Sequence, residues 1–194
     1  MKIKKITGPL EKKDISRLEC GDWVLYSGTI YTARDAAHER IAAKNKVPGE
    51  KPYDLKNKIV FYAGPTPAKP GQVTGSIGPT TSERMDSYTP ALLKAGLRAM
   101  IGKGQRSLQV KAAIKKYGSV YFAAIGGVAA LNAKTIKNSE VVAYGDLGTE
   151  AIRKVEVEGL LLVVACDSKG RDIYEEGRNK FKVNGDLDNV QRNV

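Results

Sequence analysis

Four turns in the sequence combine small residues with the residue types that bind anions. Each turn follows a predicted strand and leads into a predicted helix, and they lie at residues 27–34, 78–84, 102–104 and 125–128. A helix N-terminus carries unpaired N–H groups and a partial positive charge, so it attracts anions. Three of the turns also contain a cation, namely Arg34, Arg84 and Lys103. Ligands of open α/β sheets bind at the carboxyl ends of strands, so converging turns would suit a small carboxylate or phosphate.

The three cations also have a simpler interpretation as surface charges. A cation in the first turn of a helix is unfavourable against the helix dipole, which argues mildly for a ligand at Arg34 and Arg84. Lys103 lies between two glycines, in a turn that packs poorly but lets a ligand approach the backbone closely. Both interpretations stay open for the arginines, and Lys103 is harder to explain as a surface charge.

Two threonines and the single histidine are further candidates. Thr80-x-x-Glu83 matches a capping box, so Thr80 and Thr81 are most simply helix caps. His38 lies one helical turn beyond Arg34 on the same face, where it could act as an acid or base. A lone helical histidine is more often structural, so His38 is an additional candidate only.

Other familiar sites do not fit the sequence. Residues 102–107 half-resemble a dinucleotide fingerprint, but the third glycine and the acidic residue about 20 positions on are missing. Cys20, Cys166 and His38 supply at most three widely spaced zinc ligands, and two cysteines cannot fill a four-thiolate site. We therefore expect no metal site in this chain. The net charge of +11 favours an anionic partner or substrate, but the basic residues are spread out without a basic–aromatic signature, which argues against nucleic acid.

The hydrophobic pattern alternates strands and helices, which predicts an α/β fold with a mixed sheet. Strands are expected at 22–31, 58–63, 98–101, 119–125, 139–144 and 155–166, and helices at 32–46, 89–95, 107–117 and 128–137. Thr32 is the expected N-cap of the first helix, and Asp35 three residues later completes a pattern that resembles a capping box. A turn at 167–170 is expected to close a hairpin with residues 171–174. A long loop rich in Gly, Pro and Thr spans residues 64–79.

The length of 194 residues suits one substantial domain. No apolar run approaches the roughly 20 residues of a membrane-spanning helix, and the basic N-terminus lacks the apolar core of a signal peptide. We therefore expect a cytoplasmic protein without a membrane segment. The last twenty residues are polar, so residues 175–194 are expected to form a C-terminal extension.

Three stretches carry a family resemblance. They are LYSGTIYTARDAAHERI at 25–41, GSIGPTTSERMDSYTPALLKAG at 75–96 and YFAAIGGVAAL at 121–131. They resemble the β-subunit, or C-terminal domain, of class I iron–sulfur hydro-lyases, the family of fumarate hydratase and L(+)-tartrate dehydratase. The run from Gly78 to Tyr88 is the most specific part.

The resemblance implies a swivelling β/β/α domain over residues 1–174 that forms half of an enzyme. In this family, a separate α-subunit or N-terminal domain holds a 4Fe-4S cluster on three cysteines. The resemblance thus implies a cluster-bearing α-subunit as partner, in an α2β2 or larger assembly, and a dicarboxylate substrate.

The resemblance also implies roles for individual residues. Those that match the family's substrate-binding positions are Arg34, Thr80, Thr81, Arg84 and Lys103. Arginine forks hold carboxylates bidentately, and a lysine adds a point charge. The resemblance points to Thr80 as the catalytic base and to Lys103 as a second catalytic residue. The role of Thr80 requires nearby cations or helix dipoles to lower its pKa by many units. Glu83 departs from the family pattern, because Ser82–Glu83 stands where Ala–Gly is familiar.

Two functional alternatives remain beside a fumarate hydratase β-subunit. An L(+)-tartrate dehydratase β-subunit shares the motifs, because the two substrates are closely related dicarboxylates. A stand-alone module that binds small anions or nucleic acid would need no α-subunit and would show no hydratase activity.

Overall fold

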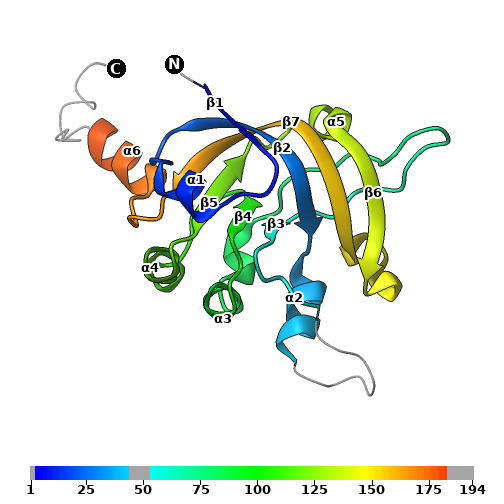
Figure 1. Ribbon diagram of the computed structural model, residues 1–194, viewed down its shortest axis with the longest axis horizontal. Helices are drawn as coiled ribbons and strands as arrows, with labels where there is room; N and C mark the ends of the chain where they lie inside the picture. The colour runs from blue at the N-terminus through cyan, green and yellow to red at the C-terminus, as the bar shows by residue number, and fades with distance from the viewer. Residues whose placement is uncertain (1–2, 44–52, 183–194) are drawn as a thin grey trace, which may run out of the picture.

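The computed structural model describes residues 3–43 and 53–182 (Figure 1). Seven strands and a set of short helices alternate along the chain. The elements are β1 (Ile3–Thr7), α1 (Lys12–Ser16), β2 (Trp23–Thr32), α2 (Asp35–Ala42), β3 (Ile59–Phe61), the 3₁₀ helix η1 (Ser82–Met85), α3 (Thr89–Lys94), β4 (Ala99–Gly102), α4 (Leu108–Tyr117), β5 (Val120–Ala124), α5 (Ala129–Lys134), β6 (Ile136–Ala143), the 3₁₀ helix η2 (Gly145–Glu150), β7 (Ile152–Cys166) and α6 (Ile173–Phe181).

The strands form one mixed sheet in the order β1-β2-β3-β4-β5-β7-β6. The first five strands in this order run parallel, and β7 runs antiparallel to β2, β5 and β6. Because β7 pairs with both β5 and β2, the strands β2, β3, β4, β5 and β7 close on one another. The structure thus confirms the prediction of an α/β fold with a mixed sheet.

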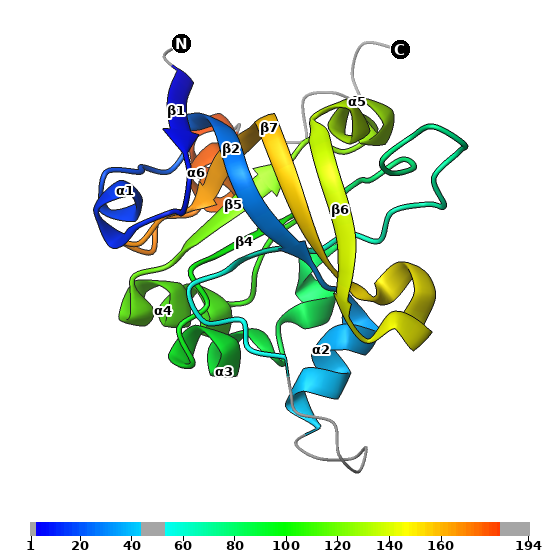
Figure 2. The ribbon, with the colours of Figure 1, turned by 45° about the vertical axis from the view of Figure 1, so that its right-hand side comes forward.

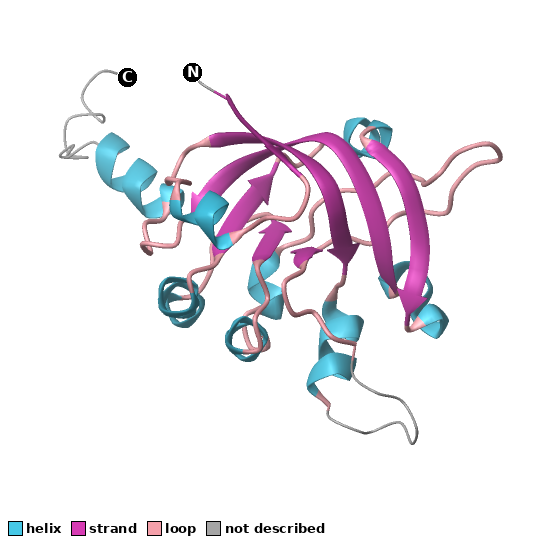
Figure 3. Cartoon of the chain, in the orientation of Figure 1, coloured by secondary structure: helices cyan, strands magenta, loops and turns pink. Residues whose placement is uncertain are grey.

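Alternating side chains of the strands fill two separate hydrophobic clusters. Ile59 and Phe61 of β3 point into the cluster enclosed by the curved sheet, together with Val157 and Leu162 of β7. Val60 lies between them in sequence and joins the second cluster, which packs under the helices. Figure 3 shows α2, α3 and α4 gathered on the same side of the strands. The period of two along the strands therefore separates the two clusters.

Local sequence signals predicted the central elements well. Helix α4 begins at the N-cap Ser107, whose hydroxyl accepts from the backbone N–H of Val110. It ends at Gly118, which has the left-handed conformation (φ +64°) that a helix C-cap requires. Strands β3, β4 and β5 also lie where the hydrophobic runs predicted them.

The predicted capping boxes were wrong. Thr32 is the last residue of β2, where its hydroxyl bonds Ala151 O and the Arg153 backbone N–H. Helix α2 starts three residues later, and residues 44–46 of the predicted helix lie outside the described residues. At the second box, Thr81 precedes a single 3₁₀ turn and makes no side-chain cap. In both cases tertiary hydrogen bonding replaced the local cap.

The ends of the chain also differ from the prediction. Strand β1 and helix α1 were not predicted from the sequence. The predicted hairpin after β7 is reduced to an isolated bridge between Cys166 and Asp172, because Asp172 caps helix α6 instead. The predicted boundary at residue 174 falls inside α6, and residues 183–194 of the predicted extension lie outside the described residues.

Two further features complete the fold. The long loop between β3 and η1 extends past β6, as Figures 1 and 2 show in green-cyan. Among the described residues, no helix combines the length and apolar character needed to cross a membrane.

Candidate functional site

The segment that contains the two threonines extends the sheet beyond the ends of β3 and β4. The Thr80 backbone N–H donates to Tyr62 O (2.7 Å), and the Lys103 N–H donates to Thr80 O (3.2 Å). The Ser82 N–H returns a bond to Lys103 O (2.9 Å), so Thr81 and Lys103 form a parallel bridge. Thr80 is half-buried, whereas Thr81 and Lys103 are exposed. The backbone thus fixes the two threonines beside Lys103.

A glycine beneath this segment allows the close approach. A Cβ atom at Gly102 would lie 1.9 Å from Ser82 Oγ and 2.9 Å from a ring carbon of Tyr62. Ser82 Oγ and the Tyr121 hydroxyl are 2.9 Å apart, and this hydroxyl donates to Gly104 O. Any side chain at position 102 would therefore push the Thr80–Ser82 segment away from β4.

The N-terminus of α2 lies at the same edge of the sheet. The Ala33 N–H donates to Phe61 O (3.1 Å), one residue before the carbonyl that receives Thr80. The aliphatic part of Arg34 lies against Gly64, since its Cδ would be 3.3 Å from a Cβ there. The end of β3 thus joins the segment of Arg34 to that of Thr80.

Arg34 and Arg84 are linked by a carboxylate between them. Asp35 Oδ1 lies 2.8 Å from Arg84 Nε, and Asp35 Oδ2 lies 3.7 Å from Arg34 Nη2. Glu150 contributes a second carboxylate, with Oε1 3.6 Å from Arg34 Nη2. Its Oε2 accepts from the Ala36 N–H (3.0 Å) and so caps α2 in place of a local residue. The two arginines therefore belong to one cluster with two carboxylates.

The fourth predicted turn joins the same region. The Ile77 N–H donates to Ala129 O (3.2 Å), and a Cβ at Gly78 would lie 3.1 Å from Ala129 Cβ. Residues 125–128 therefore lie beside the segment that leads to Thr80. The structure brings all four turns together at the carboxyl ends of β2 to β5, which is where ligands bind in open α/β sheets.

His38 lies beneath the site rather than in it. It is fully buried, its backbone N–H donates to Arg34 O, and its ring Nδ1 lies 2.8 Å from the same carbonyl. Burial lowers the pKa of His38 from its ordinary 6.5 to about 4, so the imidazole is neutral near pH 7 and Nδ1 carries the donated hydrogen. The ring packs edge-on against Tyr62 at 5.4 Å. This geometry supports Arg34 and offers no path to a solvent-borne substrate.

A buried arginine supports the site from below. Arg106 Nε lies 2.7 Å from Asp86 Oδ1, and Nη2 donates to Thr89 Oγ1 (2.7 Å). The guanidinium also lies over the rings of Tyr62 and Tyr121, at 5.3 and 5.1 Å. No local pattern in the sequence indicates that Arg106, Asp86, Asp35 and Glu150 support this site, because their contacts join residues far apart in the chain.

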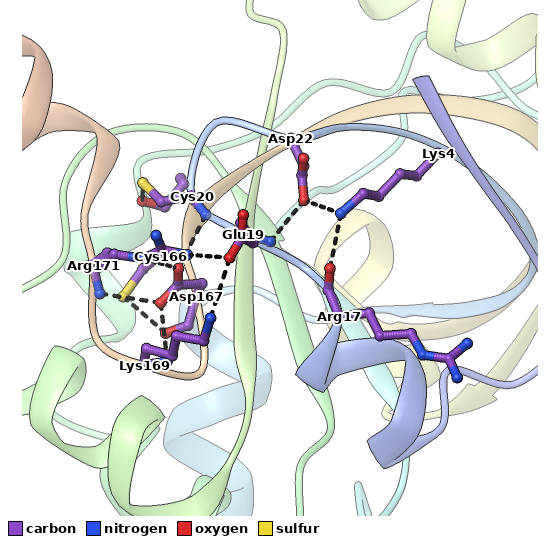
Figure 4. A network of polar contacts seen from close by, with 10 residues as sticks. Lys4, Arg17, Glu19, Cys20, Asp22, Cys166, Asp167, Lys169 and Arg171 are labelled. Carbon is purple, nitrogen blue, oxygen red and sulfur yellow. Dashed lines mark hydrogen bonds and ion pairs between the residues drawn. The ribbon is translucent and has the colours of Figure 1, made fainter. Parts of the chain in front are cut away.

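Within the described residues, no group of three or more His, Cys, Asp or Glu side chains could hold a metal ion. Cys20 and Cys166 are free thiols at the opposite end of the sheet, where the Cys20 N–H donates to Asp167 (Figure 4). Burial raises the pKa of each thiol to about 12, which keeps both protonated. With two cysteines in the sequence, the chain cannot supply three thiolates to a 4Fe-4S cluster.

Comparison with known protein families identifies the family of this chain. Residues 2–177 match the model of the family described as "Fumarase C-terminus". The chain belongs to this fumarase C-terminal family. The resemblance carried by the GPTT segment and the ARDAAH segment is thereby confirmed, and both segments lie at the site described above.

Two kinds of relative are similar to this fumarase C-terminal chain. The Methanocaldococcus jannaschii protein named "Putative L(+)-tartrate dehydratase subunit beta" is 42% identical over 177 residues, which cover 88% of this chain and 91% of that protein. The anaerobic class I fumarate hydratase of Escherichia coli K12 is 42% identical over 156 residues, covering 79% and 28% of the two chains. Fumarate hydratase 2 of Leishmania major is 38% identical over 172 residues, covering 87% and 30%. The chain thus spans about a third or less of the length of the fumarate hydratases it matches.

Proposed function

We propose that this chain is the β-subunit of a cytoplasmic two-subunit hydro-lyase that interconverts fumarate and L-malate. The observation that carries the proposal is the single sheet edge at which Thr80, Thr81 and Lys103 meet the arginine pair. Family membership and the names of the fumarate hydratase relatives support the same activity.

The proposed roles follow from charge and position. Fumarate and malate are dianions, and the forks of Arg34 and Arg84 suit carboxylates. Lys103, bonded through its backbone to Thr80 and Ser82, adds a positive charge beside Thr81. In the dehydration direction, Thr80 Oγ, as its alkoxide, takes the proton from the carbon next to a carboxylate. The hydroxyl leaves the neighbouring carbon as water, with a proton from an acid that the proposal assigns to the partner chain. The cations around Thr80 would favour its alkoxide and so support its role as base.

The 4Fe-4S cluster of the proposed enzyme does not fit this chain. The proposal therefore assigns the cluster to an α-subunit, in an α2β2 or larger complex. The tartrate dehydratase relative, whose name denotes a β-subunit and whose length this chain nearly matches, supports a two-chain organisation.

L(+)-tartrate dehydratase is the second candidate function. The relative with the most complete mutual coverage among those compared carries that name. Tartrate differs from malate by one hydroxyl, and the proposed partner would form part of the pocket. The arginine and threonine roles stay the same for either substrate.

The test is reconstitution. This chain is mixed anaerobically with a cluster-loaded candidate α-subunit, and fumarate and L(+)-tartrate turnover are measured in parallel for the mixture and each chain alone. We expect fumarate turnover in the mixture only, and a loss of about 100-fold or more in kcat/KM for Arg84→Ala, which removes a charged contact made to the dianion. Arg98→Ala is the matched control, because Arg98 precedes β4 at the opposite edge and bonds Asn57.

Each other outcome has a defined meaning. Tartrate turnover instead of fumarate turnover would keep the site and change the substrate. If a competent α-subunit gives neither a complex nor turnover, the hydro-lyase proposal fails. A stand-alone binding module for anions or nucleic acid would then be the better explanation.

A further inference from the structure

We propose that Asp35 is a positioning residue that holds Arg34 and Arg84 as a pair and leaves the terminal fork of Arg84 free for a substrate carboxylate. This inference rests on the proposed function and extends it to a residue that makes no substrate contact of its own.

The contact between Asp35 and Arg84 is made at the Nε side of the guanidinium. Asp35 Oδ1 lies 2.8 Å from Nε, and no hydrogen bond within the described part of the chain engages the two terminal nitrogens. The Arg84 side chain is 54% exposed, and among the described residues Asp35 is its ion-pair partner. Because Nη1 and Nη2 form a planar fork, a carboxylate can bind them bidentately while Nε stays on Asp35.

Arg34 is incompletely satisfied by the protein itself. Its contacts to Asp35 and Glu150, at 3.7 and 3.6 Å, exceed hydrogen-bond length. Arg34 Nε and Asp35 Oδ2 are buried and have no hydrogen-bond partner. A buried donor without an acceptor is costly, so the protein alone leaves Arg34 poorly satisfied. The Arg34 side chain is 24% exposed, and a carboxylate bound at its exposed part would add a compensating negative charge.

Asp35 is well suited to hold the pair, because its own backbone is fixed. It is the first residue of α2, between Arg34, whose carbonyl receives two bonds from His38, and Ala36, whose N–H is capped by Glu150. An acidic residue in this first turn also complements the helix dipole. The carboxylate therefore offers a rigid anchor for the flexible Arg84.

The sign of the mutational effect separates positioning from simple electrostatics. Replacing Asp35 by Asn removes a negative charge beside the site, and this change alone would tighten the binding of a dianion and lower KM. If Asp35 positions the arginines, its loss lets Arg84 swing into solvent and raises KM. A positioning role thus predicts a higher KM for Asp35→Asn, whereas a purely electrostatic role predicts a lower KM.

The kinetic test uses the reconstituted complex with fumarate. We expect Asp35→Asn to raise KM about three- to tenfold, the scale of one partly exposed ion pair, with a smaller change in kcat. Asp146→Asn is the matched control, because Asp146 pairs with Arg40 across the same α2–η2 contact without touching either site arginine. An unchanged or lowered KM in Asp35→Asn, or an equal rise in Asp146→Asn, would overturn the proposal.

A second readout does not depend on the enzyme being a fumarate hydratase. In the ¹⁵N-labelled full chain, the Nε–H signal of Arg84 should exchange with water several-fold faster in Asp35→Asn than in the wild type. Unchanged exchange would overturn the positioning role even if the complex is active. If the wild-type complex turns over neither substrate, the proposed function fails, while faster exchange still shows that Asp35 holds Arg84.

Discussion

The imidazole of His38 illustrates how a site residue is supported without reaching the substrate. It is enclosed by Tyr62 and Tyr88 at 5.4 and 6.1 Å, and Nε2 has no hydrogen-bond partner. The charged groups that affect its titration are Asp35 and Arg106, but burial is the dominant cause of its low pKa. The neutral ring can therefore anchor Arg34 O across the physiological pH range.

This burial predicts a pH-dependent stability. Between pH 6.5 and about 4, His38 is protonated in the unfolded state but stays neutral in the folded state. The free energy of unfolding therefore falls as the pH drops through this window. The shift corresponds to about 3 kcal/mol at its full extent. Urea unfolding of the wild type and of His38→Asn, measured from pH 7 to 4.5, should show a difference that shrinks as the pH falls.

The comparison of the wild type with His38→Asn reports on histidine titration at this position alone, because the sequence contains one histidine. Carboxylates contribute equally to wild type and variant, so they cancel in the difference. A difference in unfolding free energy that stays constant across the window would contradict the assignment of a neutral, buried imidazole.

At this scale, sequence identified the cations but not what holds them. Arg34, Arg84 and Lys103 each stand out because a charge beside a strand-to-helix turn is visible locally. Glu150, whose carboxylate reaches Arg34 and caps α2, lies 114 residues from Ala36 in the chain. No local pattern shows such a contact, and Asp35 was interpreted as part of a capping box for the same reason.

At the scale of the elements, Arg106 connects the supports of the site. Asp86 follows η1 and binds Arg106 through Oδ1, while its Oδ2 accepts from the Ser107 N–H that begins α4. Thr89, the first residue of α3, accepts from Arg106 and donates to Met85 O. The buried guanidinium of Arg106 therefore connects η1, α3 and α4, three short helices that would be unstable in isolation.

Removing the Arg106 guanidinium should destabilise the fold strongly. Arg106→Met keeps much of the volume but leaves Asp86 and Thr89 without their partner, and breaking a buried ion pair costs about 3–5 kcal/mol. The free energy of unfolding in urea should fall by this amount. Arg98→Met, at a partly exposed arginine bonded to Asn57, should change it by less than about 1 kcal/mol. Similar losses in both variants would show that the Arg106 network is not the main support.

Elements were predictable where their signals are local. The strands β3, β4 and β5 and the helix α4 are defined by their own apolar runs, a Ser N-cap and a Gly C-cap. Helix α2 began later than predicted because β2 continues through Thr32, where pairing with Arg153 of β7 extends the strand. Helix α6 replaced a predicted hairpin partner because the side chain of Asp172 caps the helix at the Tyr174 N–H.

At the scale of the whole molecule, closure of the sheet decides the position of the site. The antiparallel pairing of β2 with β7 joins residues more than 120 apart, such as Thr32 and Arg153. The hydrophobic periodicity of the sequence indicated the strands, but it could not indicate that β2 and β7 pair and close the sheet. The net charge of +11 would attract a dianionic substrate and an acidic partner alike, so it fits the proposed half-enzyme without choosing its substrate.

The proposed assignment of the cluster to a partner α-subunit gives the last prediction. Since this chain has only two cysteines, both protonated and remote from the site, oxidative damage to the cluster should reside entirely in the partner. Brief exposure of the active complex to oxygen should abolish turnover with loss of iron from the α-subunit. Adding fresh cluster-loaded α-subunit should restore the rate, whereas adding fresh β-chain should not. Restoration by fresh β-chain would place the oxygen-sensitive group in this chain and contradict the assignment of the cluster to its partner.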